Sequence, residues 1–343
     1  MLRLRTDAWY KDQKRIGYHE TSSLLTDLKR KSEFSWLADV SASPVQQSLR
    51  HLQTAYGNFF ARRAKHPVFK TKDAKQAAEY TTSAFKWDGK NLKLAKMSGP
   101  LHIRWSRYIP TDARITTCTV SKDRSGRYFV SVRCDDKVDC KPESLGKVGI
   151  DLGLTHFAVM SNGEKIASPA TFRKNEAKLA KLQRRFAKKK LGSKNRSKAR
   201  LRVARMYAKI SDSRNDFLHK LSTRVINENQ VIAVESLAVS NMQKNSRLSK
   251  SIADASWGEF IRQLEYKARW YGRTLIGIDR WYPSTKRCSG CGYTIESLPL
   301  YAREWTCPEC SVIHDRDINA ARNILAAGLA VSVCGESVSP VLV

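Results

Sequence analysis

The sequence has no hydrophobic run long enough to cross a membrane. A membrane-spanning helix needs roughly 20 consecutive apolar residues, and no stretch of the 343 residues has this character. Met1-Leu2-Arg3-Leu4-Arg5 is also not followed by the apolar core of a signal peptide. We therefore expect a water-soluble protein that stays in the cytoplasm and does not enter a membrane.

Acidic residues are scarce. The chain has 32 Asp and Glu against 62 Lys and Arg, which gives a formal net charge of +30. Nucleic acid is the commonest polyanion for so positive a surface to meet. A membrane surface is the alternative, but the basic stretches lack the Trp- and Leu-rich opposite face of interfacial helices.

Cysteines are too few for a small secreted disulfide scaffold. Of the eight, four are scattered through the chain (Cys118, Cys134, Cys140 and Cys334), and the others form two Cys-x-x-Cys pairs. This distribution fits a reducing compartment. Internal repeats are also absent, and the length suggests two or three domains.

The first part of the chain changes character near residue 66. Residues 1–65 are expected to be helical, with one helix starting at Ser43 as N-cap and Pro44 as first helical residue. Residues 66–145 show short alternating segments and a hairpin turn at Ser125-Gly126. We expect a small antiparallel sheet or barrel there.

The chain from residue 146 onward has the pattern of an α/β domain. Strands are predicted at 148–152, 155–160, 164–166, 231–235 and 274–278, with a type I′ turn at Asn162-Gly163. Helices are predicted at 256–271 and 318–327, ended by Gly272 and Gly328.

Residues 171–228 are helical and strongly basic. The segment from Arg173 to Arg224 has 19 Lys and Arg against three acids, and Leu191-Gly192-Ser193 divides it into a hairpin of two helices. Charge runs are usually solvated faces, but here almost no acid compensates, so nucleic-acid contact is favoured. The candidate contacts are Arg173, Lys181, Arg184, Arg185, Lys188, Lys189, Arg200 and Arg202.

Two matched cysteine pairs form a candidate zinc site. Cys288-x-x-Cys291 and Cys307-x-x-Cys310 are separated by fifteen residues, and each pair supplies two thiolates from one tight turn. Four thiolates fill a tetrahedral shell, so the zinc would be structural. Two redox or disulfide pairs are the alternative, which this spacing disfavours. His314 is expected to be a surface or hinge histidine.

Three acids lie where strands end or a helix begins. Asp151 is inside an apolar strand, Glu235 closes another, and Asp317 opens the last helix. A buried acid is costly without a partner or a metal. In a basic protein, carboxylates in this order suggest a nuclease that uses divalent cations, although a lone buried Asp is more often structural.

Four segments carry a family resemblance, which runs from about Leu2 to Gly335. They are Gly149-Ile150-Asp151-Leu152-Gly153, Val234-Glu235-Ser236-Leu237, Ser284-Thr285-Lys286-x-Cys288-Ser289-x-Cys291-Gly292 and Asp315-Arg316-Asp317-x-Asn319-Ala320-Ala321-x-Asn323-Ile324. Together they resemble the TnpB (OrfB) family of transposon-encoded, RNA-guided DNA endonucleases, which is related to compact type V CRISPR effectors.

The resemblance implies a multidomain α+β chain with an RNase H-like (RuvC) nuclease domain and an inserted four-cysteine zinc ribbon. The expected parts are a helical recognition region (1–65), a β-rich wedge (66–145), the nuclease domain (146–287), the ribbon (288–310) and a final nuclease segment with the tail (311–343). It makes Asp151, Glu235 and Asp317 the metal-binding catalytic residues, with Mg²⁺ or Mn²⁺ as cofactor. Asp317 is preferred over Asp315 because it directly precedes the x-Asn-Ala-Ala segment, and Asp279 is expected to be a surface acid.

Family members usually begin with a strand and half a helix ahead of the segment equivalent to Leu2-Arg3-Leu4-Arg5, so a few tens of residues are expected to be missing here. The function expected from the resemblance is cleavage of target DNA directed by a guide RNA. Alternatives are an RNA-dependent DNA-binding protein that no longer cuts, a transposase that performs strand transfer, and an inactive relic. The oligomeric state is left open.

Overall fold

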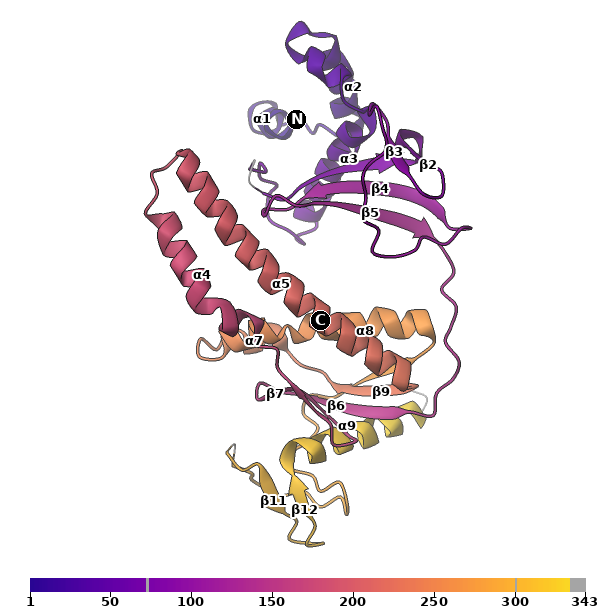
Figure 1. The fold of residues 1–343 in the computed structure, drawn as a ribbon, viewed down its shortest axis with the longest axis vertical. Coiled ribbons are helices and arrows are strands. Elements are labelled where there is room, and N and C mark those ends of the chain that lie inside the picture. The colour runs from indigo at the N-terminus through magenta and orange to yellow at the C-terminus, as the bar shows by residue number, and fades with distance from the viewer. Residues whose placement is uncertain (72–73, 300, 334–343) are drawn as a thin grey trace. The chain divides into compact units, whose positions relative to one another are not determined.

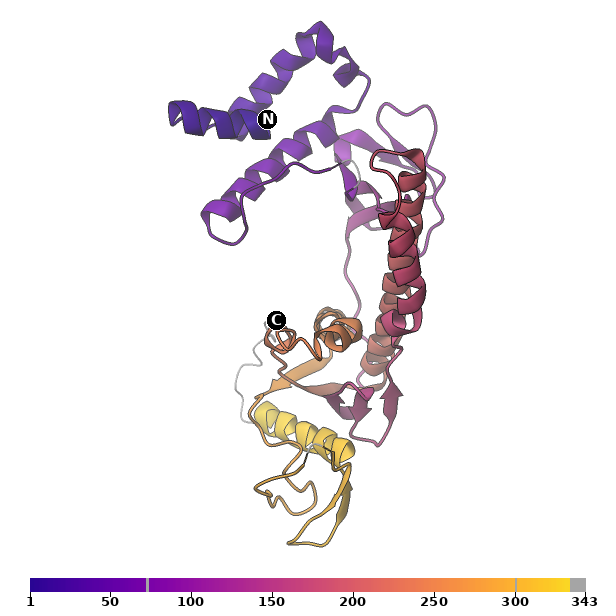
Figure 2. The ribbon, with the colours of Figure 1, turned by 90° about the vertical axis from the view of Figure 1, so that its left-hand side faces the viewer.

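A computed structural model describes residues 1–71, 74–299 and 301–333, so the predicted positions Cys334 and Gly335 lie outside the described residues. The chain divides into two compact units, Met1–Lys137 and Val138–Val343 (Figures 1 and 2). None of the described helices combines the length and the apolar character needed to cross a membrane.

The first unit begins with helices. They are α1 (Leu2–Asp12), α2 (Tyr18–Arg30), the 3-10 helix η1 (Ser32–Ala38) and α3 (Ala42–Phe60). Leu25, Leu37 and Leu49 form their small core. The predicted N-cap of α3 is wrong by two residues: the helix begins at Ala42, and the Ser43 hydroxyl instead accepts a hydrogen bond from the Thr81 backbone N–H at 3.1 Å.

An open antiparallel sheet follows in the same unit. Its order is β1 (Gln76–Thr81), β4 (Arg114–Lys122), β5 (Tyr128–Asp135); η2 (Thr82–Ala84) and the ribbon β2 (Phe85–Trp87) and β3 (Leu92–Leu94) lie between β1 and β4 in the chain. The predicted hairpin at Ser125-Gly126 is confirmed, with Gly126 at φ 84. The prediction of a barrel is wrong for the described residues, because three strands are too few to close on themselves.

The second unit is built on a five-stranded mixed sheet. Its order is β10 (Thr274–Ile278), β9 (Val231–Glu235), β6 (Lys147–Leu152), β7 (His156–Met160), β8 (Lys165–Ala167). The first three strands are parallel, and β7 and β8 are antiparallel additions. All five strands lie within one residue of their predicted positions. The predicted type I′ turn is wrong, since Gly163 alone of the pair has a positive φ, at 96°.

Helices cover both faces of this sheet. Figure 1 shows α5 (Lys194–Glu228) and α8 (Trp257–Tyr271) on one face and α9 (Arg316–Val333) on the other. The main core lies under α5 and α8 and includes Phe157, Leu218 and Phe260, which are fully buried. The remaining helices are α4 (Thr171–Ala187), α6 (Val239–Met242) and α7 (Ser249–Ala255).

The helix α9 approaches the sheet closely because two glycines remove side chains at the contact. A Cβ at Gly149 of β6 would lie 2.1 Å from the Ala321 carbonyl oxygen, and one at Gly328 would lie 2.6 Å from the Ala233 Cβ. The prediction that Gly328 ends this helix is therefore wrong. Gly328 lies inside α9, where it serves packing and not termination, whereas Gly272 does end α8 in the left-handed conformation.

Candidate metal centres and nucleic-acid surface

The three predicted carboxylates converge at one end of the sheet. Gly149 and Ala233 face α9, and side chains two residues further along a strand point to the same face, so Asp151 and Glu235 also face α9. The parallel pairing of Ile150 with Val234 makes Asp151 and Glu235 neighbours. Asp317 lies in the first turn of α9. The alternation of side chains along β6 and β9 and the position of Asp317 at the start of α9 therefore bring all three acids together.

The electrostatics of this cluster are those of like charges that are only partly exposed to water. Burial, followed by the negative charges of Glu235 and Asp317, raises the pKa of Asp151 to about 7, while Arg316 acts in the opposite direction. Burial also raises the pKa of Glu235. A raised pKa means that the surrounding protein does not stabilise the charged form of the carboxylate as well as water does. A bound cation would supply that stabilisation, so the cluster is suited to one.

Arg303 is a neighbour of this cluster that the sequence did not single out. Its guanidinium lies 3.5 Å from Asp317 Oδ2 and donates to Thr155 Oγ1 at 3.3 Å. It precedes the short hairpin of β11 (Glu304–Thr306) and β12 (Ile313–Asp315), which leads directly into α9. No local pattern marks Arg303, because the contact depends on how this hairpin folds back.

Asp315, the neighbouring acid, is engaged differently. Its Oδ1 accepts hydrogen bonds from the backbone N–H groups of Asp317 and Ile318 at 3.1 and 3.0 Å, which caps α9, and Oδ2 pairs with Lys165 at 2.5 Å. Although burial acts to raise it, the pKa of Asp315 is lowered by Lys165 and these N–H donors. Asp279 is exposed and caps a turn, accepting from the Trp281 N–H at 2.6 Å.

The four predicted cysteines form a compact cluster. Their Sγ atoms all lie within 4.8 Å of one another, and the pairs Cys288–Cys310 and Cys291–Cys307 are 3.6 Å apart. Tetrahedral zinc with bonds of about 2.3 Å places its sulfurs roughly 3.8 Å apart. The cysteines are free and too far apart for disulfides, so the donor set fits zinc and the disulfide alternative does not apply.

Each cysteine pair sits on the same backbone turn. Gly292 N–H donates to the Cys288 carbonyl at 2.9 Å, and Ser311 N–H donates to the Cys307 carbonyl at the same distance. Gly292 and Ser311 both have positive φ, at 84° and 58°. Glycine adopts this left-handed conformation without strain in the first turn, and serine takes the equivalent, strained position in the second.

The prediction that His314 lies at the surface is wrong. The side chain is only 4% exposed, and its Nε2 lies 2.9 Å from Cys288 Sγ. The ring also packs on Trp305, with centroids 4.8 Å apart. The alternation of β12 turns this histidine inward, which a three-residue strand does not reveal in sequence.

Two asparagines tie the first cysteine turn to α9. Asn319 Nδ2 donates to the Arg287 carbonyl at 2.7 Å, and Asn319 Oδ1 accepts from Ser289 N–H at 2.9 Å. Asn323 Nδ2 donates to the Ser284 carbonyl at 2.8 Å. Both side chains are nearly fully buried. The start of α9, which holds Asp317, is thus hydrogen-bonded to the cysteine cluster.

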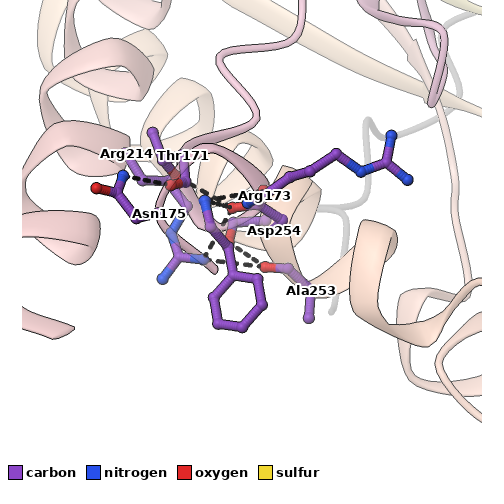
Figure 3. A network of polar contacts seen from close by, with 8 residues as sticks. Thr171, Arg173, Asn175, Arg214, Ala253 and Asp254 are labelled. Atoms are coloured by element: carbon purple, nitrogen blue, oxygen red, sulfur yellow. Dashed lines mark hydrogen bonds and ion pairs between the residues drawn. The ribbon is translucent and has the colours of Figure 1, made fainter. Parts of the chain in front are cut away.

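One carboxylate caps the start of the basic hairpin and joins both of its helices to α7. Asp254, on α7, accepts hydrogen bonds from Thr171 Oγ1 and from the backbone N–H of Phe172, both at 3.0 Å, so it caps the start of α4 (Figure 3). Arg214 of α5 lies 3.9 Å from the same carboxylate and donates to the Ala253 carbonyl at 3.2 Å. The sequence did not predict this cap, because its acceptor lies more than eighty positions away.

The predicted nucleic-acid residues all lie on α4, on α5 or in the loop that joins them. The structure confirms two helices with a break at Gly192, and all eight basic residues except the half-buried Arg200 are exposed. A hollow of about 430 Å³ near the joining loop has a basic lining. Its basic residues are Arg185, Lys188, Lys189, Lys198 and Arg202.

Comparisons with known proteins agree across the chain. Residues 129–246 match the OrfB family of the IS605 group, described as "Probable transposase", and residues 257–324 match the "Cas12f1-like, TNB domain". A Streptomyces pristinaespiralis protein named "Putative RNA-guided DNA endonuclease" is 52% identical over 337 residues, covering 98% of this chain and 84% of that protein.

One further relative and one solved structure extend this comparison. The Escherichia coli K12 protein "Putative RNA-guided DNA endonuclease InsQ" is 35% identical over 343 residues, covering 95% of this chain and 84% of that protein. The fold resembles Cas12f1 in its complex with sgRNA and target DNA, with a TM-score of 0.57 over 94% of this chain and 78% of the other at 15% identity. The sequence identities over nearly the whole chain show that it belongs to the OrfB (TnpB) family.

Proposed function

We propose that this chain is an RNA-guided DNA endonuclease in which Asp151, Glu235 and Asp317 hold divalent cations, Mg²⁺ or Mn²⁺. The observation that carries the proposal is the convergence of three half-buried carboxylates from β6, β9 and α9, where Asp151 is held near a pKa of 7. Hard oxygen donors of this kind suit Mg²⁺ and Mn²⁺.

The bound cations would supply Lewis-acid chemistry for phosphodiester hydrolysis. The chain's own residues hold them and place the substrate. Partial burial reduces the screening of the carboxylates by water, and Arg303 provides a positive charge beside Asp317. Asp315 keeps the first turn of α9 closed, so that Asp317 enters the site from a fixed helix start.

The proposed partners are a guide RNA and a target DNA, as the names of the relatives suggest. Residues 1–65 and 66–145 would recognise the guide–target duplex and the motif beside the target. Residues 146–287 and 311–343 would form the RuvC-like nuclease, with the ribbon at 288–310. The exposed basic residues of α4 and α5 would bind phosphates, which makes the affinity fall steeply with salt.

Zinc would act on this site through α9. The cysteine turns hold the Arg287 carbonyl and Ser289 N–H, which in turn hold Asn319, two residues beyond Asp317. Loss of zinc should therefore displace Asp317 and lower cleavage, although no cysteine contacts the scissile bond. Normal cleavage by folded, zinc-free protein would limit zinc to a general stabilising role.

The test is cleavage of a plasmid target with the RNA transcribed from the element's end, in Mg²⁺. Wild type should cut, and Asp151→Ala should not. Equal cleavage by both would refute the assignment. RNA-dependent DNA binding without any cutting would instead favour a binding protein, and joining of donor ends would favour strand transfer by a transposase.

A further inference from the structure

Trp281 is a large apolar side chain left in solvent, in the loop that follows β10 at the end of the sheet where the carboxylates lie. It is 83% exposed, more than Trp9, Trp36, Trp105 or Trp270. It follows β10, whose last residue, Ile278, pairs with Glu235 in the parallel register. Neighbouring strands are about 4.8 Å apart, so β10 ends roughly 10 Å from the Asp151 backbone, two strands away.

The residues before and after Trp281 hold its loop in place. Asp279 Oδ1 accepts from the Trp281 N–H at 2.6 Å, and the Asp279 carbonyl accepts from the Tyr282 N–H at 3.2 Å. Tyr282 packs against Ile278 and Ile324 in the cluster beneath α9. The backbone that presents the indole to solvent is therefore held in place, because the neighbouring Tyr282 packs against the core.

We propose that Trp281 is a stacking platform for an unpaired base of the DNA strand that reaches the carboxylate site. This deepens the proposed function and rests on it. An exposed aromatic ring can stack on any unpaired base, whereas a base inside a duplex is already stacked on its neighbours. The exposed side chain of Arg280 lies next in sequence, where a phosphate of the same strand would be attracted.

The chain offers a matched control for this inference. Trp270 is also exposed, at 44%, and belongs to the same unit. It lies at the end of α8, just before β10 begins, and so at the opposite end of that strand from Trp281. A general effect of losing a tryptophan should appear in both variants, whereas loss of the platform should appear only at Trp281.

The first measurement is binding of a fluorescent thymidine oligonucleotide without Mg²⁺, at a salt concentration that weakens phosphate contacts. Trp281→Ala should raise the dissociation constant at least about fivefold, the effect of roughly 1 kcal/mol. Trp281→Phe should recover part of the loss, and Trp270→Ala should match wild type. An abasic oligonucleotide of equal length and charge should bind wild type and Trp281→Ala alike.

The second measurement is photocrosslinking of an iodouracil-containing oligonucleotide, with the modified residue located by mass spectrometry. Crosslinking at Trp281 is expected. Equal binding by all variants, together with crosslinks at other residues, would overturn the inference. It would also be overturned if Trp281→Ala changed the oligomeric state of the protein and left its affinity for bases unchanged. Because neither readout depends on cleavage, the inference can fail while the Asp151-dependent cleavage stands, and the reverse.

Discussion

Replacing Asp151 with Asn should stabilise the protein when no Mg²⁺ is present, at the cost of its activity. Burial and the charges of Glu235 and Asp317 raise the pKa of Asp151 from its ordinary value of 3.8 to about 7. The native state therefore binds this proton more tightly than the unfolded state does. Between pH 4 and 7 the free energy of unfolding falls as the pH rises, and below the unfolded pKa the penalty vanishes.

The size of this penalty follows from the shift. A difference of roughly three pKa units at about 1.4 kcal/mol each gives about 4 kcal/mol at pH 8 and about 2 kcal/mol at pH 5. Asn keeps the shape of the side chain and removes the charge. Asp151→Asn should thus gain close to these amounts over wild type in urea unfolding, with the larger gain at pH 8.

The comparison of variants isolates this carboxylate together with its repulsion of Glu235 and Asp317, because the zinc ligands and the other groups of the protein titrate alike in both proteins. Asp216→Asn, which removes an exposed acid paired with Lys220, is the control and should change stability little at either pH. Adding Mg²⁺ should stabilise wild type and leave Asp151→Asn nearly unchanged. A destabilised Asn variant at pH 8, or a gain that does not depend on pH, would refute the account of a repulsive cluster.

Four other perturbations test separate parts of the structure. Cys288→Ser should lower both the zinc content, measured by elemental analysis, and the melting temperature; a folded wild type without zinc would contradict the site. Gly149→Ala should cost about 1–3 kcal/mol or more in denaturant unfolding, because its Cβ would lie 2.1 Å from the Ala321 carbonyl oxygen. Asp254→Ala should cost about 1–2 kcal/mol, since it removes the cap of α4, with Asp254→Asn less affected. Lys181→Ala with Lys188→Ala should reduce the dependence of nucleic-acid binding on salt by about one unit of slope for each phosphate that the variant no longer binds; an unchanged slope would place the nucleic acid elsewhere.

Features set by neighbouring residues could be predicted from the sequence. The five strands of the second unit follow from short apolar runs, and the break at Gly192 follows from a residue that adopts a left-handed conformation. The cysteine cluster was predictable because each Cys-x-x-Cys pair defines its own turn, so that only the spacing between turns had to suit a tetrahedron.

Features set by contacts between distant segments could not be predicted. Gly328 has the pattern of a helix end in the sequence, but in the structure it allows α9 to pack closely against Ala233. His314 looked like a surface residue because its burial depends on Trp305 and Cys288. The prediction of a barrel was wrong for a similar reason, since the alternation of apolar and polar residues predicts strands but not how many of them pair. Arg303 reaches Asp317 only because the hairpin of β11 and β12 folds back toward the start of α9.

The central claim is that Asp317, with Asp151 and Glu235, forms the cleavage site. Its most direct test is RNA-guided plasmid cleavage in Mg²⁺ by Asp317→Asn and by Asp315→Asn, two matched changes two residues apart. Asn can still cap α9 at position 315, so Asp315→Asn should keep most of the cleavage rate, whereas Asp317→Asn should lose it. Cleavage that survives Asp317→Asn and is lost with Asp315→Asn would contradict the account.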